Sequence, residues 1–201
     1  MKNWHKYKYE DPDNIYTDSK THVLLNKLGI EDDNLLTVTE SIWCGRRLEE
    51  LAIKPIKIKS AETILKIHGY IFQDMYEWAG KVRTVQISKE GTQFLPTERF
   101  SDGFSYINEL IEEYWILDDN ISSIAKKLAE LLDAINHLHP FREGNGRTQR
   151  EFIRVLALEK GYRLDLSSAE DKDVFERYMS GTIEGNKKLL TELIESIIAK
   201  I

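Results

Sequence analysis

The sequence is poor in residues that cross-link or interrupt a chain, with one cysteine and four prolines among 201 residues. The single Cys44 excludes an intramolecular disulfide and a zinc site made of several cysteines. It lies in an apolar-leaning helical stretch, so we expect an inert, buried thiol. Because proline interrupts helices, its scarcity is typical of a mostly helical chain.

Positive charge is also in deficit, since 28 lysines and arginines face 34 acidic residues, for a net charge of −6. General nucleic-acid binding needs a basic surface, so we expect no nucleic-acid partner. No run approaches the roughly 20 apolar residues of a membrane helix, and the N-terminal segment has no apolar signal-peptide core. We therefore expect a cytoplasmic protein without a membrane partner.

Apolar residues recur at helical spacing along most of the chain, which predicts a single all-α domain over residues 1–201. The helix expected over residues 121–138 is apolar nearly all round, so it should be central and buried. The other expected helices cover about residues 35–53, 60–79, 97–115, 147–160, 167–179 and 189–198.

One segment has a β pattern instead. Residues 82–88 are rich in β-branched side chains, residues 89–91 suit a turn, and residues 92–94 suit a short return strand. Such a small hairpin is marginal alone, so we expect it to lean on the helices or to act as a flap. The first 20 residues are predicted to form an arm lying on the domain.

The stretch HPFREGNGRTQR, residues 139–150, follows the expected central helix. Gly144, Asn145 and Gly146 tolerate positive φ, so their backbone N–H groups can point into one concavity at a helix N-terminus. Arg147 and Arg150 lie three residues apart and can face the same side. Guanidinium groups and a helix N-terminus both favour anions, and a phosphate chain suits them.

Two further residues of this stretch carry useful chemistry. Glu143 offers the hard oxygen that Mg²⁺ takes beside nucleotide phosphates, and His139 can accept a proton near neutral pH. Taken singly, the acid could equally form an ion pair and the histidine a structural hydrogen bond. Their convergence over twelve residues favours an anion site, and the residues alone lead no further.

The stretch resembles the core motif of the Fic family, H-x-F-x-[DE]-G-N-G-R-x-x-R, at every fixed position, Phe141 included. The resemblance covers roughly residues 40–185. It implies a helical Fic domain with a β-hairpin flap, a catalytic core at about 35–180 and a C-terminal inhibitory segment and helix at about 180–201. The matching residues upstream are Ile67, His68, Ile71, Phe72, Met75, Tyr76, Trp78, Ala79, Gly80, Arg83, Ile87, Ser88, Lys89 and Phe94.

The resemblance implies a protein adenylyltransferase, which moves AMP from ATP to a Tyr, Thr or Ser hydroxyl of a target protein. His139 would be the general base, and Glu143 would bind Mg²⁺. The loop of residues 144–146 would hold the phosphates, Arg147 would neutralise the β-phosphate region, and Arg150 would pair with the γ-phosphate.

The flap and Gly146 carry two further expectations of the same resemblance. Lys89, Gly91, Thr92 and Phe94 would dock a target segment by strand addition. The related Doc-type kinases carry lysine where this chain has Gly146, so we expect adenylyl rather than phosphate transfer.

A second run, SGTIEGN at residues 180–186, resembles the family's inhibitory motif S-x-x-x-E-[GN] in the class with a C-terminal inhibitory helix. Glu184 would compete with the γ-phosphate for Arg150, and Ser180 would hold the inhibitory helix in place. The same glutamate would support removal of AMP in some relatives. Read without the resemblance, the run is an ordinary helix end, because glycines flank Glu184.

Several alternatives remain open at this stage. A Fic-type transferase could move UMP, phosphocholine or phosphate, and a silent copy could act as a regulatory binding module. A metal-dependent phosphohydrolase would use His137 and His139, but the other histidines are scattered. Self-association through the apolar last helix and the aromatic N-terminal arm is compatible with the sequence.

Overall fold

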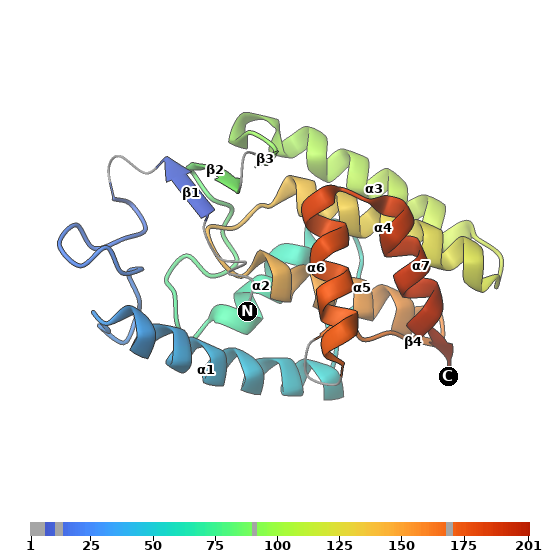
Figure 1. Cartoon of the computed structure of the whole chain (residues 1–201), viewed down its shortest axis with the longest axis horizontal. Helices are drawn as coiled ribbons and strands as arrows, with labels where there is room; N and C mark the ends of the chain where they lie inside the picture. Colours follow the sequence, from blue (N-terminus) through green and yellow to red (C-terminus); the bar gives the residue numbers. More distant parts are fainter. Residues whose placement is uncertain (1–6, 11–13, 90–91, 168–170) are drawn as a thin grey trace.

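The computed structural model describes the chain except for residues 1–6, 11–13, 90–91 and 168–170, and within that part it contains seven α-helices (Figure 1). This confirms the predicted helical class. The helices are α1 (Asp33–Ile53), α2 (Thr63–Phe72), α3 (Phe100–Ile116), α4 (Ile121–Leu138), α5 (Asn145–Glu159), α6 (Lys172–Glu184) and α7 (Lys187–Ile197), with a 3₁₀ turn at Thr97–Arg99.

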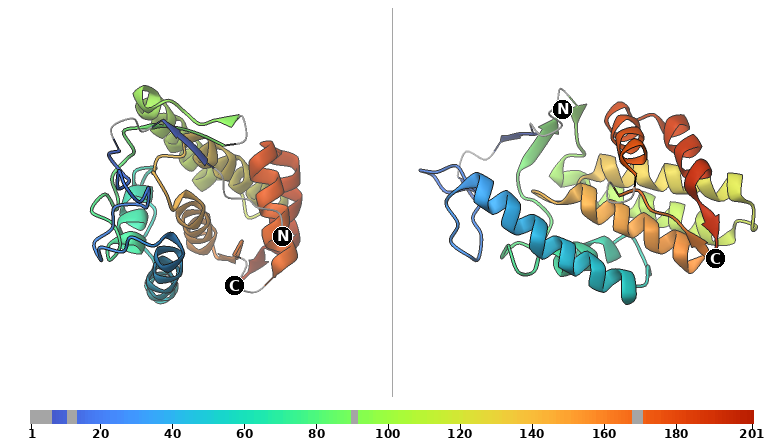
Figure 2. Two further views of the ribbon diagram at one scale, coloured as in Figure 1. Left: turned by 60° about the vertical axis from the view of Figure 1, so that its left-hand side comes forward. Right: turned by 60° about the horizontal axis from the view of Figure 1, so that its bottom comes forward.

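Helix α4 is the centre of the molecule, as its apolar sequence predicts. It packs against α3, α5 and α7, and Figure 2 shows these helices around it. Asn120 starts the helix by accepting a hydrogen bond from the backbone N–H of Ser123 at 3.0 Å. The helix therefore provides a rigid support for the loop that follows it. Its buried residues are Ile124, Ala125, Leu128, Ala129, Leu131, Leu132, Ile135 and Leu138.

The predicted hairpin is present with shorter strands than the sequence suggested, and a third strand joins it. Strand β2 (Gln86–Lys89) pairs antiparallel with β3 (Thr92–Gln93), and β1 (Tyr7–Glu10) adds to the other edge of β2. Tyr9 lies opposite Ile87, and Ser88 lies opposite Gln93. Part of the N-terminal arm is thus a strand of the flap sheet. A second two-stranded sheet joins β4 (Tyr162–Arg163) to β5 (Ala199–Lys200).

Helices α6 and α7 form a pair joined at Gly185, which has a φ of 60°. The apolar face of α7 is buried, with Leu190, Leu193 and Ile194 at 0% exposure. It is therefore used inside the fold and offers little surface for self-association. The domain boundary expected at about residue 180 lies within α6, which begins after the N-cap residue Asp171 rather than at Ser167.

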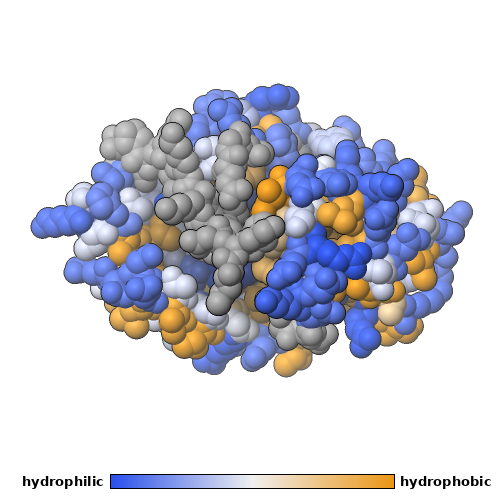
Figure 3. All heavy atoms as spheres, viewed as in Figure 1, coloured by the Kyte–Doolittle hydropathy of each residue, from blue (hydrophilic) through white to orange (hydrophobic). Residues whose placement is uncertain are grey.

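Exposed apolar side chains lie on α1 instead. Its outer face includes Leu35, Val38 and Ile42, each more than half exposed. Figure 3 shows hydrophobic residues along the lower left of the molecule, where Figure 1 places this helix. Among the described residues, no helix is long and apolar enough to cross a membrane.

Candidate active site

The site is built where α4 gives way to α5. His139 follows the last residue of α4 in the left-handed conformation, with a φ of 42°, and its backbone N–H still donates to Ile135. This conformation turns the chain sharply out of the helix. Gly144 is also in the left-handed conformation, with a φ of 82°, and is the N-cap residue of α5. Two left-handed turns therefore enclose the loop of the motif.

The ring of His139 is buried at 3% exposure and stacks on Phe94 of the flap, with ring centroids 3.7 Å apart. Its Nδ1 lies 3.2 Å from the carbonyl oxygen of Asn136. A carbonyl only accepts hydrogen bonds, so Nδ1 carries the proton of the neutral ring. Nε2 is then the basic nitrogen, as a general base requires.

Arg83 fixes the same turn from behind. This fully buried side chain donates to three carbonyl oxygens, those of His139 at 2.9 Å, Val85 at 2.6 Å and Leu95 at 2.7 Å. Burial lowers the pKa of Arg83 to about 10, which leaves it charged at neutral pH. One guanidinium thus ties the turn at His139 to both sides of the flap.

The loop between the two turns is held by its own side chains. Asn145 accepts from the backbone N–H of Phe141 at 3.0 Å and donates to the carbonyl of the same residue at 2.8 Å. The Asn145 side chain is therefore a structural clasp, and only its backbone N–H is offered to an anion. Gly144 donates its backbone N–H to the Glu143 carboxylate at 2.9 Å, so in this structure the Gly144 N–H is bound to Glu143.

Glycine is required at position 144 for two reasons. Its φ is positive, and a Cβ there would lie 2.2 Å from the Phe72 ring. His68 supports the loop from below, because its Nδ1 accepts from Gly80 N–H at 2.8 Å and its Nε2 lies 3.0 Å from the Glu143 carbonyl. Its ring also stacks on Phe141 at 3.8 Å.

Arg147 is on the first turn of α5, and its Nη2 donates to Glu40 of α1 at 2.5 Å. Its guanidinium lies over the Phe72 ring, 4.7 Å from the centroid. Burial is the largest influence on Arg147 and opposes its charge, but the attraction of Glu40, Cys44 and Glu143 together outweighs burial, so the pKa of Arg147 is raised. Tyr76 donates its hydroxyl to the second Glu40 oxygen.

Arg150 lies one turn further along α5. Its guanidinium faces the rings of Phe175 and Tyr178 of α6, at 5.4 and 5.2 Å from their centroids. A Cβ at Gly146 would lie 3.3 Å from Arg150 Nη1, so glycine leaves this guanidinium room over the helix N-terminus. Backbone N–H groups of the first turn have no acceptor inside the helix, and they point to the same end.

The two arginines open onto a pocket of about 380 Å³ between α1, α5 and the segment of residues 165–167. Gly45, Leu48 and Ala52 of α1 form an apolar wall opposite Arg147 and Arg150. The motif thus combines guanidinium groups, a helix N-terminus and a basic histidine nitrogen at one end of α5. This combination can bind a phosphate chain and accept a proton beside it.

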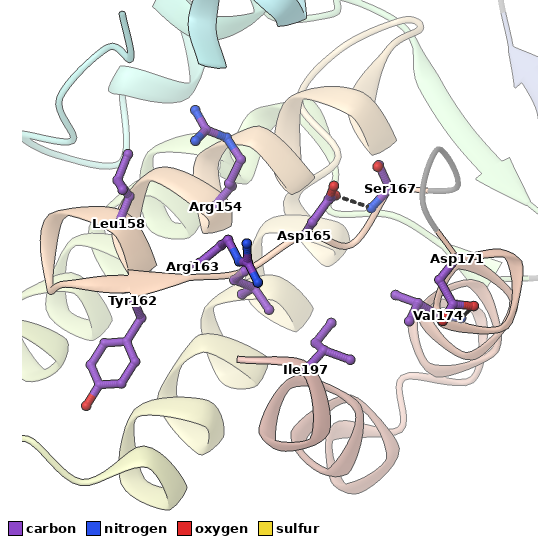
Figure 4. A pocket seen from close by; sticks show the side chains of 10 residues that line it. Arg154, Leu158, Tyr162, Arg163, Asp165, Ser167, Asp171, Val174 and Ile197 are labelled. Carbon is purple, nitrogen blue, oxygen red and sulfur yellow. Dashed lines mark hydrogen bonds between the residues drawn. The ribbon is translucent and has the colours of Figure 1, made fainter. Parts of the chain in front are cut away.

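A neighbouring pocket of about 370 Å³ lies between α5, β4 and the α6–α7 pair (Figure 4). It shares Arg154 and Asp165 with the first pocket. Arg154 makes two hydrogen bonds to Glu151, at 2.7 and 2.8 Å, and Asp165 accepts from the Ser167 N–H at 2.7 Å. Arg147 and Arg150 line only the motif pocket, so the motif pocket is the better anion site.

The flap residues predicted to dock a target have different positions. Phe94 is 8% exposed and packs on His139, so it shapes the site rather than the outer surface. Lys89 and Thr92 lie in paired strands, and Thr92 is on the edge strand β3. Gly91 lies outside the described residues.

The structure does not bring the predicted inhibitory residues to Arg150. Glu184 is exposed at the end of α6, and within the described part of the chain it forms no ion pair with Arg150. Gly185 and Asn186 instead end α6 and cap α7, where Asn186 accepts from Leu189 N–H at 3.0 Å. Ser180 is half-buried on α6.

Sequence reasoning missed Glu40, the acid that does pair with a motif arginine. One signal was available, because Glu40 lies four residues from both Leu36 and Cys44, on the apolar face of the predicted helix. Cys44 itself is buried, and burial raises the pKa of its thiol to about 12, as expected for an inert cysteine.

Fold and site together define a helical domain in which a loop at a helix N-terminus follows a buried histidine and is suited to bind phosphate. A sequence model of the Fic/DOC family matches residues 58–157, and the chain belongs to this family. The chain is 37% identical, over 93% of its own length, to the protein adenylyltransferase VbhT of Bartonella schoenbuchensis. It spans only 39% of that relative.

Two further comparisons agree. The chain is 35% identical to the probable protein adenylyltransferase y4lH of Sinorhizobium fredii, covering 81% of this chain and 86% of that protein. Its fold matches the crystal structure of the BepC protein of Bartonella tribocorum with bound AMPPNP. That match has a TM-score of 0.81 over 92% of this chain and 97% of the other, at 23% identity.

Proposed function

We propose that this protein transfers AMP from ATP to a hydroxyl side chain of a target protein. The observation that carries the proposal is the loop of residues 139–150, which begins at His139 with Nε2 as its basic nitrogen and leads directly into the N-terminus of α5 and its arginines. Relatives covering most of this chain carry the name protein adenylyltransferase, which supports the same activity.

In the reaction, the target hydroxyl oxygen attacks the α-phosphorus of ATP. The bond from that phosphorus to the oxygen shared with the β-phosphate breaks, and pyrophosphate leaves. Nε2 of His139 takes the hydroxyl proton, while Nδ1 stays bonded to the Asn136 carbonyl. Arg83 and Phe94 hold the ring in place, so most of the catalysis is positioning.

Charge neutralisation is the second contribution. The first-turn N–H groups of Asn145, Gly146 and Arg147 face the phosphates together with the positive end of the α5 dipole. The guanidinium groups of Arg147 and Arg150 meet the β- and γ-phosphates. These preorganised donors stabilise the charge that pyrophosphate gains as it leaves.

Glu143 is the residue proposed to hold Mg²⁺. Its carboxylate is only half-buried and is oriented by the Gly144 N–H at 2.9 Å. The donor set fits, because Mg²⁺ usually takes one or two protein carboxylates and completes its shell with phosphates and water. Within the described residues no group of three His, Cys, Asp or Glu side chains could hold an ion, so nucleotide phosphates would supply the other ligands. When bound, the ion supplies positive charge to the phosphates.

The target segment would add to the flap at β3, because β1 already occupies the other edge of β2. Thr92 and Gln93 form this edge strand, and the stack of Phe94 on His139 links the strand to the catalytic ring. The edge position thus favours delivery of a target hydroxyl to Nε2. The cytoplasmic location, self-association and the lack of nucleic-acid and membrane partners stay predictions from the sequence.

Inhibition by Glu184 also stays a proposal, and it would require α6 to move. Tyr178 faces Arg150, whereas Glu184 lies six residues further on, about 9 Å along the axis at 1.5 Å per residue. The rings around Arg150 leave its N–H donors available to a carboxylate or a phosphate, so the competition remains chemically reasonable. Removal of AMP from a target with help from Glu184 is likewise a proposal.

The test uses ATP labelled at either the α- or the γ-phosphate, with Mg²⁺ and a cell lysate. Label on protein from the α-position alone supports AMP transfer, and label from the γ-position alone indicates a kinase. Labelled UTP and CDP-choline test UMP and phosphocholine transfer. We expect His139→Ala to lower α-labelling by at least about a hundredfold, because it removes the general base. No labelling from any of these donors by Glu184→Gln, which lacks the proposed inhibitory charge, would favour a silent binding module.

A further inference from the structure

Glu40 is a buried acid that no motif of the chain contains. It lies on the inner face of α1, outside the segment matched by the family, and its side chain is 12% exposed. A buried carboxylate is costly unless each oxygen has a partner. Glu40 meets this condition, because one oxygen accepts from Arg147 and the other from the Tyr76 hydroxyl.

The three residues come from three separate elements. Glu40 lies on α1, Tyr76 follows α2, and Arg147 begins α5. Burial raises the pKa of the Tyr76 phenol, and Glu40 raises it further, so the hydroxyl stays a donor. We call these three residues the Glu40 clamp. Its hydrogen bonds have a fixed direction, in which Tyr76 and Arg147 donate and Glu40 accepts.

The Glu40 clamp restrains the guanidinium of Arg147 and leaves most of its N–H donors available. Glu40 takes one hydrogen bond from Nη2 of Arg147, while the Phe72 ring covers one face of the group. A guanidinium has five N–H donors in a rigid fork, so the remaining donors are oriented once Nη2 is fixed. The side chain is 24% exposed and lines the motif pocket.

We propose that Glu40 is a positioning residue of the nucleotide site, which orients Arg147 for the phosphates and limits how tightly they bind. This inference rests on the proposed binding of ATP at the loop. The carboxylate fixes the direction of the guanidinium, which assists the departing pyrophosphate. It also places a negative charge behind that guanidinium, which weakens the attraction for ATP.

The two effects predict opposite changes in binding and turnover when Glu40 becomes Gln. The amide keeps nearly the same shape but loses the charge, so Mg-ATP should bind about three- to tenfold more tightly, as expected for a partly screened charge near the phosphates. Turnover at saturating ATP should fall about tenfold, because Arg147 is held less firmly and pyrophosphate leaves more slowly. AMP, which has no β-phosphate, should bind as it does to wild type.

The matched control is Glu50→Gln on the same helix. Glu50 also accepts from an arginine and a tyrosine, Arg47 and Tyr70, both at 2.8 Å, but neither belongs to the motif. We expect this variant to match wild type in binding of Mg-ATP and in turnover. Calorimetry measures binding, α-labelling measures turnover, and circular dichroism confirms that each variant is folded.

Weaker or unchanged ATP binding by folded Glu40→Gln, or equal tightening in Glu50→Gln, would overturn the inference. If Glu40→Gln does not fold, Glu40→Asp replaces it, since the shorter acid keeps the charge but reaches less far. It should lower turnover without tightening ATP binding, and wild-type turnover would contradict the clamp. Binding needs no catalysis, so a Glu184→Gln protein that binds ATP but transfers no AMP refutes the proposed function alone.

Discussion

At the scale of single residues, the site depends on polar side chains buried behind it. His68 and Arg83 are both almost fully buried, yet within the described part of the chain neither one forms a hydrogen bond with a carboxylate. Each one is satisfied mainly by backbone groups of the loop or the flap. Their charge states therefore affect how firmly the loop is held.

His68 predicts how stability depends on pH. Burial lowers its pKa from the ordinary 6.5 to about 3, so the folded protein keeps it neutral. Below pH 6.5 the His68 ring binds a proton in the unfolded chain but stays neutral in the folded chain. The contribution of His68 to the free energy of unfolding is therefore fully present above pH 6.5 and is lost as the pH falls toward 3. Within this window the free energy of unfolding falls by about 1.4 kcal/mol for each pH unit of acidification.

Urea unfolding between pH 7 and pH 4 measures this slope. We expect His68→Gln to be less stable than wild type at pH 7 but to lose less stability on acidification. The exposed His137→Gln should keep the wild-type slope. Equal slopes for wild type and His68→Gln would show that His68 does not resist protonation.

At the scale of elements, α5 and α6 together surround Arg150. Helix α5 supplies the guanidinium, and α6 supplies the two rings beside it and, at its end, the exposed Glu184. The expected ranges for α1, α3 and α4 are confirmed within a few residues, whereas α2 ends at Phe72 rather than near residue 79. Which face of α6 meets α5 depends on packing, which periodicity does not specify.

The proposed inhibition is tested at this scale with Glu184→Gln. If α6 moves so that Glu184 reaches Arg150, loss of the charge should raise α-labelling several-fold, about 1 kcal/mol for a partly exposed ion pair. Glu176→Gln, an exposed acid on the same helix, serves as the control. Equal labelling by wild type and Glu184→Gln would contradict the inhibitory role.

At the scale of the whole molecule, the N-terminal strand joins the flap across about 80 residues of sequence. Strand β1 pairs with β2, and the Tyr16 hydroxyl accepts from the Thr84 N–H at 3.1 Å near the base of the flap. A two-stranded hairpin of this size is marginal alone, so the third strand should stabilise it. The pocket onto which Arg147 and Arg150 open lies elsewhere, between α1 and α5.

Removal of residues 1–10 should therefore affect use of the target protein but not binding of ATP. We expect ATP binding to stay unchanged and AMP transfer to a target protein to fall about threefold to tenfold, since the flap loses strand pairing worth about 1 kcal/mol. Calorimetry and α-labelling in lysate measure the two quantities. A loss of ATP binding would show instead that the arm supports the whole domain, and unchanged transfer would remove β1 from target docking.

The sequence by itself determined the helices, the hairpin and the chemistry of residues 139–150. These features are local, because helical periodicity, caps and a loop of fixed spacing are written within short windows of the chain. The family membership follows from the same short motif. The proposed roles of His139 as general base and of Arg147 and Arg150 in phosphate binding required no knowledge of packing.

Only the tertiary structure decided the partners of those residues. It placed Glu40 on Arg147, aromatic rings around Arg150, Phe94 on His139 and a distant strand on the flap. Such contacts join segments that lie 25 to 107 residues apart, so no local pattern specifies them. The physical reason is that burial forces each charged or polar group to find a partner, and the fold determines which partner is within reach.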